Sequence, residues 1–295
     1  MIDFLKIRWA ALIFSTAIII SFIGTYIYRV QVGKEPLNFS VDFTGGTVVR
    51  FKFDKEVPGH EIKTILDNAG WPGASIREFT SDNSVIVRVQ AFESDAMGLA
   101  VRMKDAIAKD LPSTNITITQ SESVGQTIGA ALRKDSIWAV ALALLAMLIY
   151  IILRFRSLGF ALGAVFALLH DAIVILAVFM FSGLEISVNV IMAILAILGY
   201  SINDTIVIFT QIRKNLAHMG SASLYEVVNT SINQMLRRTL LTSLSTGLTV
   251  TALLVLGGEA LRNLSIALLV GIIIGTYSSI YIACSTMMLI YNKKQ

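Results

Sequence analysis

One apolar run of this sequence, long enough to cross a bilayer, contains an aspartate. Residues 188–209 are almost wholly apolar, yet they include Asp204. A carboxylate at the centre of a membrane span costs about 2.5–3.5 kcal/mol on insertion scales, so it is usually kept for a proton, an ion or a partner charge. We predict that Asp204 serves in a proton or ion relay or pairs with a charge, with Ser201, Asn203 and Thr205 as supporting polar residues. The alternative is an acid that only stabilises the fold through a hydrogen bond.

A second pair of ionisable residues, His170 and Asp171, lies near the middle of another apolar run, 159–181. Adjacent side chains on a helix point about 100° apart, so the two need not contact each other. Burying both groups at this depth is costly. We predict that they belong to the proton relay. The alternative is a structural lock in which either residue bonds a neighbouring helix.

A polar stripe begins at Arg238, where another apolar run starts. Arg238, Thr242, Ser245 and Thr249 recur at helical spacing, so they share one face of a helix. Such a stripe could line water and offer Asp204 a cation. Alternatively, the arginine only sets topology at the helix end, and the hydroxyls bond their own backbone carbonyls.

The composition identifies the class of protein. The chain has 295 residues, of which 55% are hydrophobic and 15% are charged. Soluble domains carry about 25% charged residues, so the composition predicts an α-helical integral membrane protein. A helical span needs about 20 apolar residues. Six runs qualify: Trp9–Tyr28, Ser136–Leu153, Gly159–Phe181, Ser187–Phe209, Thr239–Leu256 and Leu264–Tyr291.

Basic residues predict the orientation of these spans. They cluster before the first span, in the loops that follow the second and fourth spans, and after the last span, all of which lie on the same side of the membrane. The positive-inside rule assigns that side to the cytoplasm. Both termini are therefore expected in the cytoplasm, and 29–134 outside it. The net charge of +4 reflects this topology, so we expect no nucleic-acid partner. The clustered residues are Lys6, Arg8, Arg154, Arg156, Arg213, Lys214, Arg237, Arg238, Lys293 and Lys294.

Residues 29–134 are predicted to form one small external domain between 1–28, with the first span, and 135–295, a five-helix bundle. Asp135 is expected to cap the second span. Strand and helix patterns follow each other in the order βαββαβ, which is typical of a ferredoxin-like α+β fold. The predicted elements are Thr47–Phe53, His60–Ala69, Ser75–Phe79, Ser84–Val89, Ser94–Leu111 and Asn115–Gln120, with a turn at 81–83.

No pattern of residues indicates an enzyme. No lysine stands at the spacing of a phosphate-binding loop, the histidines are scattered, and we find neither a metal-ligand spacing nor a nucleophile triad. The motif Asp42-Phe43-Thr44-Gly45-Gly46-Thr47 predicts a turn into the first strand. The single cysteine, Cys284, is expected to pack in the last span. We therefore expect no catalytic residue, metal or cofactor.

These motifs resemble those of the SecD/SecF family of bacterial protein-export membrane proteins, over nearly the whole chain. One departure is visible, because the family usually has an acid and then Arg after the fourth span. Here Thr210-Gln211-Ile212-Arg213 stands, so no acidic role is expected at Thr210. The family motifs are matched by Asp42, Phe43, Gly45 and Gly46 after the first span, by His170-Asp171, by Ser201–Val207, and by Arg238-Thr239-Leu240 with Thr242-Ser243.

The resemblance implies a six-span subunit of the bacterial cytoplasmic membrane. It would pair with SecD in a twelve-span, pseudo-symmetric assembly similar to the resistance-nodulation-division transporters. Its further partners would be the SecYEG channel with the SecA motor, YajC and YidC, preproteins and membrane lipid. The family uses the proton-motive force to promote preprotein translocation. Proton passage is implied at Asp204, with Arg238 nearby and protons as the coupling ion.

Two other functions remain open at this point. The first is a half-transporter of the same superfamily that exports small molecules. An aromatic-lined pocket in the external domain would favour it, although about 105 residues is small for such a domain. The second is a scaffold that organises the translocase without conducting protons, in which Asp204 would be a structural lock.

Overall fold

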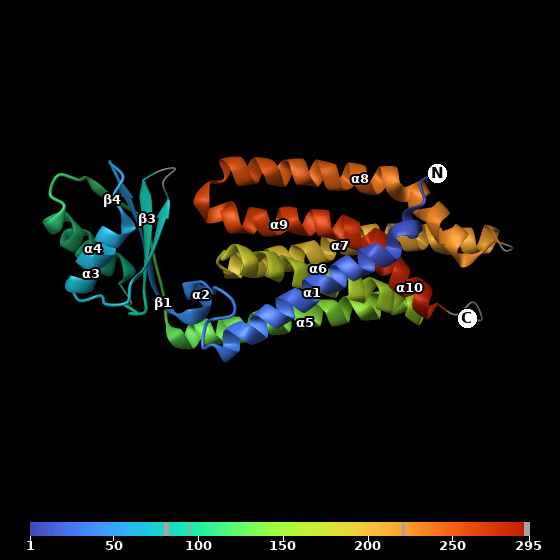
Figure 1. Cartoon of the computed structure of the whole chain (residues 1–295), viewed down its shortest axis with the longest axis horizontal. Coiled ribbons are helices and arrows are strands. Elements are labelled where there is room, and N and C mark those ends of the chain that lie inside the picture. Colours follow the sequence, from blue (N-terminus) through green and yellow to red (C-terminus); the bar gives the residue numbers. More distant parts are fainter. Residues whose placement is uncertain (80–82, 94, 220–221, 292–295) are drawn as a thin grey trace. The chain divides into compact units, whose positions relative to one another are not determined.

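The computed structural model describes residues 1–79, 83–93, 95–219 and 222–291 of the chain. These residues form two compact units (Figure 1). The helical unit comprises Met1–Asn38 and Ser136–Gln295, and the second unit comprises Phe39–Asp135. Helix α5 (Gln126–Phe155) contributes its first turns to the second unit and its remainder to the helical unit.

The second unit is a small α+β structure built on one four-stranded sheet. The strand order is β2-β3-β1-β4, and all neighbouring strands are antiparallel. This agrees with the predicted βαββαβ order. The turn predicted at 81–83 lies outside the described residues except for Asn83, whose φ is 51°. The elements are α2 (Val41–Thr44), β1 (Gly46–Phe53), α3 (Gly59–Asn68), β2 (Ser75–Phe79), β3 (Ser84–Val89), α4 (Ala96–Asp110) and β4 (Ile116–Val124).

One face of this sheet carries the hydrophobic core. Successive side chains of a strand point to opposite faces, and in β1 the inward set is Val49, Phe51 and Phe53. Helices α3 and α4 cover this face (Figure 1), and their apolar sides complete the core. Helix α3 ends at Asn68, two residues before Gly70, which adopts a φ of +101°. The helical contributions are Ile62, Ile65, Leu66, Leu99, Ala100, Met103 and Ile107.

The Gly45-Gly46 motif is a close-packing device in the second unit. Both glycines have positive φ, +75° and +112°. A Cβ on Gly45 would lie 2.7 Å from Gln126 Cα, and a Cβ on Gly46 would lie 2.4 Å from Val89 O. Gly129 completes the contact, because its Cβ would meet Gly45 N at 3.0 Å. The motif therefore lets α2 and β1 touch the first turn of α5.

Two neighbours of these glycines reinforce α2. The Thr44 hydroxyl donates to Ser40 O at 3.2 Å, and Phe43 packs edge-on against Phe39. Asp42 stands in the first turn of α2, where a carboxylate interacts favourably with the helix dipole. The four motif residues are thus explained by local packing.

The helical unit contains six apolar helices long enough to span a membrane, counted over the described residues. This number confirms the sequence prediction. The last helix includes one π-helical turn, η2. The helices are η1 (Phe4–Ile7) with α1 (Arg8–Gln31), α5, α6 (Leu158–Ser182), α7 (Val188–His218), α8 (Leu224–Leu256), and α9 (Gly258–Ser278) with η2 (Ser279–Ala283) and α10 (Cys284–Ile290).

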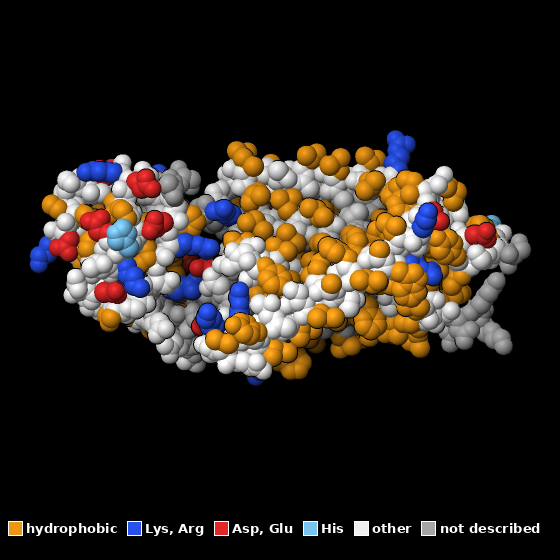
Figure 2. Space-filling view, viewed as in Figure 1, with side chains coloured by type: hydrophobic (Ala, Val, Ile, Leu, Met, Phe, Trp, Pro, Cys, Tyr) orange, Lys and Arg blue, Asp and Glu red, His pale blue; other side chains and the backbone are white. Residues whose placement is uncertain are grey.

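Three of these helices form the interior of the unit. In the apolar 18-residue segments of α6, α7 and the α9–α10 helix, 61%, 50% and 50% of the residues are buried. In the corresponding segments of α1, α5 and α8 the shares are 11%, 6% and 11%. Hydrophobic side chains spread over the face of the helical unit that Figure 2 shows. The outer helices therefore present apolar surface suited to lipid or to partner helices.

Glycines bring the inner helices into close contact. A Cβ on Gly163 of α6 would lie 2.7 Å from Ala283 O in η2, and a Cβ on Gly271 of α9 would lie 2.5 Å from Ile197 of α7. Small residues at such crossings let helix backbones approach closely in membranes.

The expectation that Asp135 caps the second span is wrong. Helix α5 begins at Gln126, so Asp135 is an exposed residue inside it. The helix starts earlier because residues 126–134 contain no proline, and their one glycine, Gly129, costs only about 1 kcal/mol in a helix, so helical structure continues outward from the apolar span.

A buried polar network in the helical unit

Asp204 lies at the middle of α7 and is 3% exposed. The groups that act on its carboxylate come from α8: Ser243 through its hydroxyl and Arg238 through its charge. Its Oδ2 atom makes no hydrogen bond within the described part of the chain. Buried polar atoms normally find partners. This oxygen can therefore accept a proton without breaking an existing hydrogen bond.

Other unpartnered oxygens lie within one helical turn of this site. Tyr200 OH precedes Asp204 by one turn of α7, and Thr239 Oγ1 precedes Ser243 by one turn of α8. Thr239 is 1% exposed. Ser243 also pairs with Thr276 Oγ1 of α9 at 2.7 Å. The surroundings of Asp204 are thus polar, with hydrogen-bonding capacity to spare.

His170 and Asp171 form a second buried centre, joined to three other helices. His170 Nδ1 lies 3.2 Å from Asp171 Oδ1, so the two residues do contact each other. Ser201 of α7 donates to Asp171 Oδ2 at 2.6 Å. His170 Nε2 lies 3.0 Å from Ser15 Oγ of α1, and Ser15 Oγ lies 3.0 Å from Tyr277 OH of α9. We call these five residues the His170 junction.

The π-helical turn η2 borders this junction. Ser279 Oγ lies 2.9 Å from Thr205 Oγ1, and Ser201 O lies 3.4 Å from each of them. One of the two hydroxyls donates to the other, which in turn donates to Ser201 O. A π-turn in an α-helix is rare and frequently marks a functional site. Here it widens the helix at the level where α7 carries Ser201 and Thr205.

Three of the predicted supporting residues do not join these sites. Thr242 and Ser245 donate to the carbonyls of Arg238 and Leu241, four residues earlier in their own helix. Asn203 is exposed on α7. The hydroxyls of the predicted stripe therefore bond backbone carbonyls of their own helix. The hydroxyl of α8 that acts on Asp204 belongs to Ser243, which is outside the stripe.

Sequence reasoning missed three residues of the network, Ser15, Tyr277 and Ser279, and named Ser243 only as part of a family motif. Each is a polar residue in an apolar run, which is the only signal available. Ser and Thr are common in spans and usually bond their own helix, so the type alone does not single them out. Their importance follows from which helices pack together.

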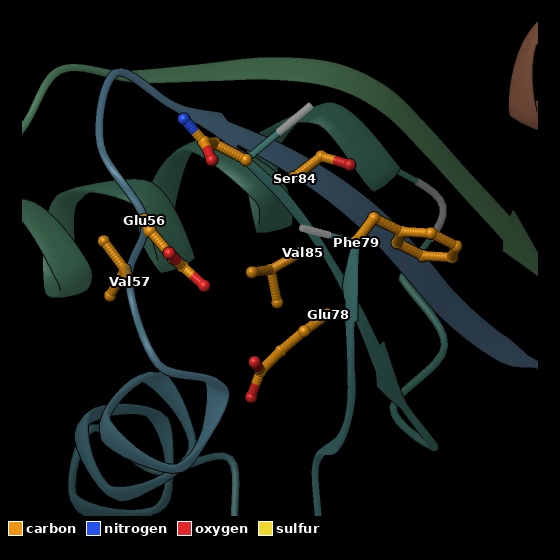
Figure 3. Close-up of a pocket in the computed structure, with 7 residues that line it drawn as sticks. Glu56, Val57, Glu78, Phe79, Ser84 and Val85 are labelled. Carbon is orange, nitrogen blue, oxygen red and sulfur yellow. The ribbon is translucent and has the colours of Figure 1, made fainter. Parts of the chain in front are cut away.

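A small recess lies among the described residues of the second unit. This recess holds about 10 Å³ and is lined by Glu56, Glu78, Phe79 and Val85 among others (Figure 3). The Glu78 carboxylate accepts a hydrogen bond of 2.6 Å from Gly59 N, which caps the N-terminus of α3. A cavity of this size holds about one water, so it offers no room for an organic ligand.

The buried acid on α7, its α8 partner groups and the His170 junction define a multi-pass membrane protein with ionisable groups in its bundle interior. Residues 103–293 match the family described as protein export membrane protein SecD/SecF, C-terminal, and residues 32–57 match the SecD/SecF GG motif. The GG match includes Gly45 and Gly46. The chain belongs to the SecD/SecF family of protein-export membrane proteins.

Full-length relatives support this assignment. Protein translocase subunit SecF of Desulfurispirillum indicum is 36% identical over 98% of this chain and 91% of its own length. Protein translocase subunit SecF of Pseudomonas aeruginosa is 36% identical over 96% of this chain and 89% of its own length.

A solved structure supports the fold. The crystal structure of SecDF from Thermus thermophilus, described as a translocon-associated membrane protein, aligns with 98% of this chain at a TM-score of 0.85 and 31% identity. This chain spans 38% of the SecDF chain. The match therefore concerns one part of that larger protein.

Proposed function

We propose that this chain is a subunit of the bacterial protein-export translocase that works with SecD and uses the proton-motive force to promote preprotein translocation. The observation that carries the proposal is the buried Asp204 carboxylate, which has an unbonded oxygen and the charge of Arg238 on the next helix. Protons are the proposed coupling ion, and no other cofactor is required.

The coupling step follows from charge. Protonation of Asp204 removes its negative charge, so the attraction between α7 and Arg238 of α8 weakens and the two helices can shift. One elementary charge crossing the full membrane potential releases about 2.3 kcal/mol per 100 mV. That energy is sufficient to bias a two-state element. The second unit, which continues directly into α5, would follow this shift. His170 and Asp171 take part as a second protonatable centre.

Exposed polar groups on α7 and α8 support a partner within the membrane. Asn203 is exposed near the middle of α7, and Ser245 and Thr249 are exposed on α8. A polar side chain in a span usually faces protein and not lipid. We assign this surface to SecD, consistent with the fused SecDF relatives. SecYEG with SecA, YajC, YidC and the preprotein are the further partners proposed.

The topology proposed for the chain has both termini in the cytoplasm and the second unit outside the membrane. The arrangement of basic residues supports it. Within the helical unit, the N-terminal segment and α10 lie at the same end (Figure 1), where Arg8 of α1 contacts Met288. The antiparallel order β2-β3-β1-β4 supports assigning the second unit to the ferredoxin-like class.

The efflux alternative finds little support in the second unit. A porter needs a chamber for its substrate, and binding pockets are typically about 300–1,000 Å³. The recess described there holds about 10 Å³. The scaffold alternative makes a different prediction, because a structural Asp204 could be replaced by asparagine, which still forms hydrogen bonds.

The decisive experiment measures completion of preprotein translocation in vesicles that contain the translocase, SecD and this chain, with and without a proton gradient. We expect Asp204→Asn to lose the acceleration that the gradient gives and to assemble normally. Asp135→Asn is the matched control, since it removes an exposed carboxylate. If Asp204→Asn responds to the gradient like the parent, the scaffold function replaces our proposal.

A further inference from the structure

The His170 junction links four helices through side chains that are almost fully buried. Ser15 is 3% exposed, His170 4%, Asp171 0% and Ser201 1%. Helix α1 is otherwise mostly exposed, since its apolar window is 11% buried. The contact of Ser15 with His170 therefore ties a peripheral helix to the interior of the bundle.

The donor of each hydrogen bond between Tyr277, Ser15 and His170 follows from counting hydrogens, starting at Tyr277. Tyr277 OH has one hydrogen, which it donates to Ala11 O at 2.8 Å. The bond between Tyr277 and Ser15 is then donated by Ser15. Ser15 has no second hydrogen, so His170 Nε2 must carry a hydrogen and donate it to Ser15 Oγ.

The same counting fixes the protonation of the histidine–aspartate pair. With Nε2 protonated, His170 Nδ1 faces Asp171 Oδ1 at 3.2 Å, and two bare lone pairs would repel each other there. One proton must lie between them. The pair is either imidazolium with carboxylate or neutral imidazole with carboxylic acid, and in both forms its net charge is zero.

We propose that the His170 junction is a proton-held clamp that ties α1 to α7. When the shared proton leaves, Nδ1 and Oδ1 both present lone pairs, and one uncompensated negative charge remains in the bundle interior. Such a charge is strongly unfavourable there. His170 turns away from Asp171 and its bond to Ser15 breaks, so that among the described residues α1 keeps only its bonds to Tyr277 at this level and can move away from α6 and α7.

Few other titratable groups near the His170 junction could cause a pH dependence of the clamp. Tyr277 of α9 belongs to the junction and contacts the His170 ring, and Tyr281 of η2 packs against the ring of Tyr277. On α7, Asp204 lies three residues beyond Ser201, and the charge acting on it is Arg238 of α8. From α1 the junction receives Ser15, which does not titrate.

The clamp depends on the proposed function only for its role in protein export. In that role, release of α1 would transmit a change of protonation toward the second unit. Its physical test needs neither preprotein nor a gradient. Failure of the clamp would leave the Asp204→Asn translocation result standing, and failure of that result would leave the clamp measurable.

The test is a distance measurement between spin labels on α1 and α7. Labels replace two exposed residues, Ile20 at 64% and Met192 at 52% exposure, in the full chain in lipid nanodiscs with buried Cys284 changed to serine. In the parent we expect one distance at acidic pH and a second, longer distance that gains population as pH rises.

Two variants separate the proton from the tether. Asp171→Asn keeps a hydrogen bond to His170 without a shared titrating proton, so we expect the short distance at every pH. Ser15→Ala leaves the pair intact and removes its bond to α1, so that within the described part of the chain only the bond from Tyr277 to Ala11 O remains at this level. We therefore expect the longer distance to gain population at every pH. If Asp171→Asn does not fold, the pH dependence of the parent still tests the proton. Tyr277→Phe then serves as a second tether variant, because it removes the bond to Ala11 O and should raise the long-distance population.

Three results would overturn the clamp. The parent could show the same distances at every pH, Asp171→Asn could keep the full pH dependence, or Ser15→Ala could retain the short distance. The first would mean that the pair does not release its proton, the second that another group titrates, and the third that α1 is held elsewhere.

Discussion

Ser201 on α7 donates a hydrogen bond of 2.6 Å to Asp171 on α6, which joins two inner helices by a buried carboxylate and a buried hydroxyl. Helix α9 closes on the same point, because a Cβ on Gly275 would lie 3.0 Å from Ser201 Cβ. Three helices therefore meet at one side chain, three residues before Asp204.

Ser201→Ala should destabilise the bundle. The substitution leaves Asp171 Oδ2 without its donor in a site that excludes water, and an unsatisfied buried acceptor costs about 1–3 kcal/mol. Thermal unfolding in detergent, followed by circular dichroism, should show a lower midpoint. Ser245→Ala is the control, since Ser245 is exposed and bonds only its own helix. Equal midpoints for the two variants would contradict the importance of this bond.

Gly45→Ala should destabilise the second unit by more than backbone strain alone. Its Cβ would lie 2.7 Å from Gln126 Cα, at a φ of +75°. Strain at positive φ costs about 1–3 kcal/mol, and the clash with a helix backbone adds to it. Gly73→Ala isolates the strain, because Gly73 has a φ of +82° but open space around it.

The measurement for this pair is limited proteolysis of the full chain, with cleavage followed within 39–135. Cleavage should accelerate strongly for Gly45→Ala and weakly for Gly73→Ala. If the two variants are cleaved at the same rate, the contact of the motif with α5 contributes nothing to stability.

The sequence alone predicted the helices and acids because both signals are local. Hydropathy over about 20 residues identifies a span, and a charged residue inside such a span stands out without knowledge of its neighbours. Ser15 and Tyr277 could not be found this way, because their positions follow from the packing of α1 and α9 against α6. The stripe beginning at Arg238 has the spacing of one helix face, yet its Thr242 and Ser245 hydroxyls bond backbone carbonyls of α8 itself.

Gly163→Ala should overpack the interior. The added methyl would lie 2.7 Å from Ala283 O, within the π-helical turn, and overpacking of this kind costs about 1–3 kcal/mol. Gly199→Ala is the matched control on α7, where a Cβ meets nothing within 4 Å. We expect a lower midpoint of thermal unfolding only for Gly163→Ala. A parallel decrease in the control would attribute the effect to helix composition and not to packing.

The N-terminal segment is held by two asparagines one turn apart on α8. Asn233 accepts from Ile2 N at 2.9 Å and donates to Ile2 O at 2.7 Å. Asn229 accepts from Phe4 N at 2.9 Å and donates to Ile2 O at 3.1 Å. These side chains replace the backbone partners that an extended segment would find in a sheet.

Replacing both asparagines by alanine should release this segment. Without them, the amides of Ile2 and Phe4 lose their acceptors, so hydrogen–deuterium exchange of residues 1–7 should accelerate at least tenfold, as expected when about 1.4 kcal/mol of local protection is lost. Tyr225→Phe gives the comparison, because it removes only the bond from Tyr225 OH to Asp3 and leaves those amides bonded. Unchanged exchange in the double variant would mean that the burial of Leu5, at 1% exposure, holds the segment by itself.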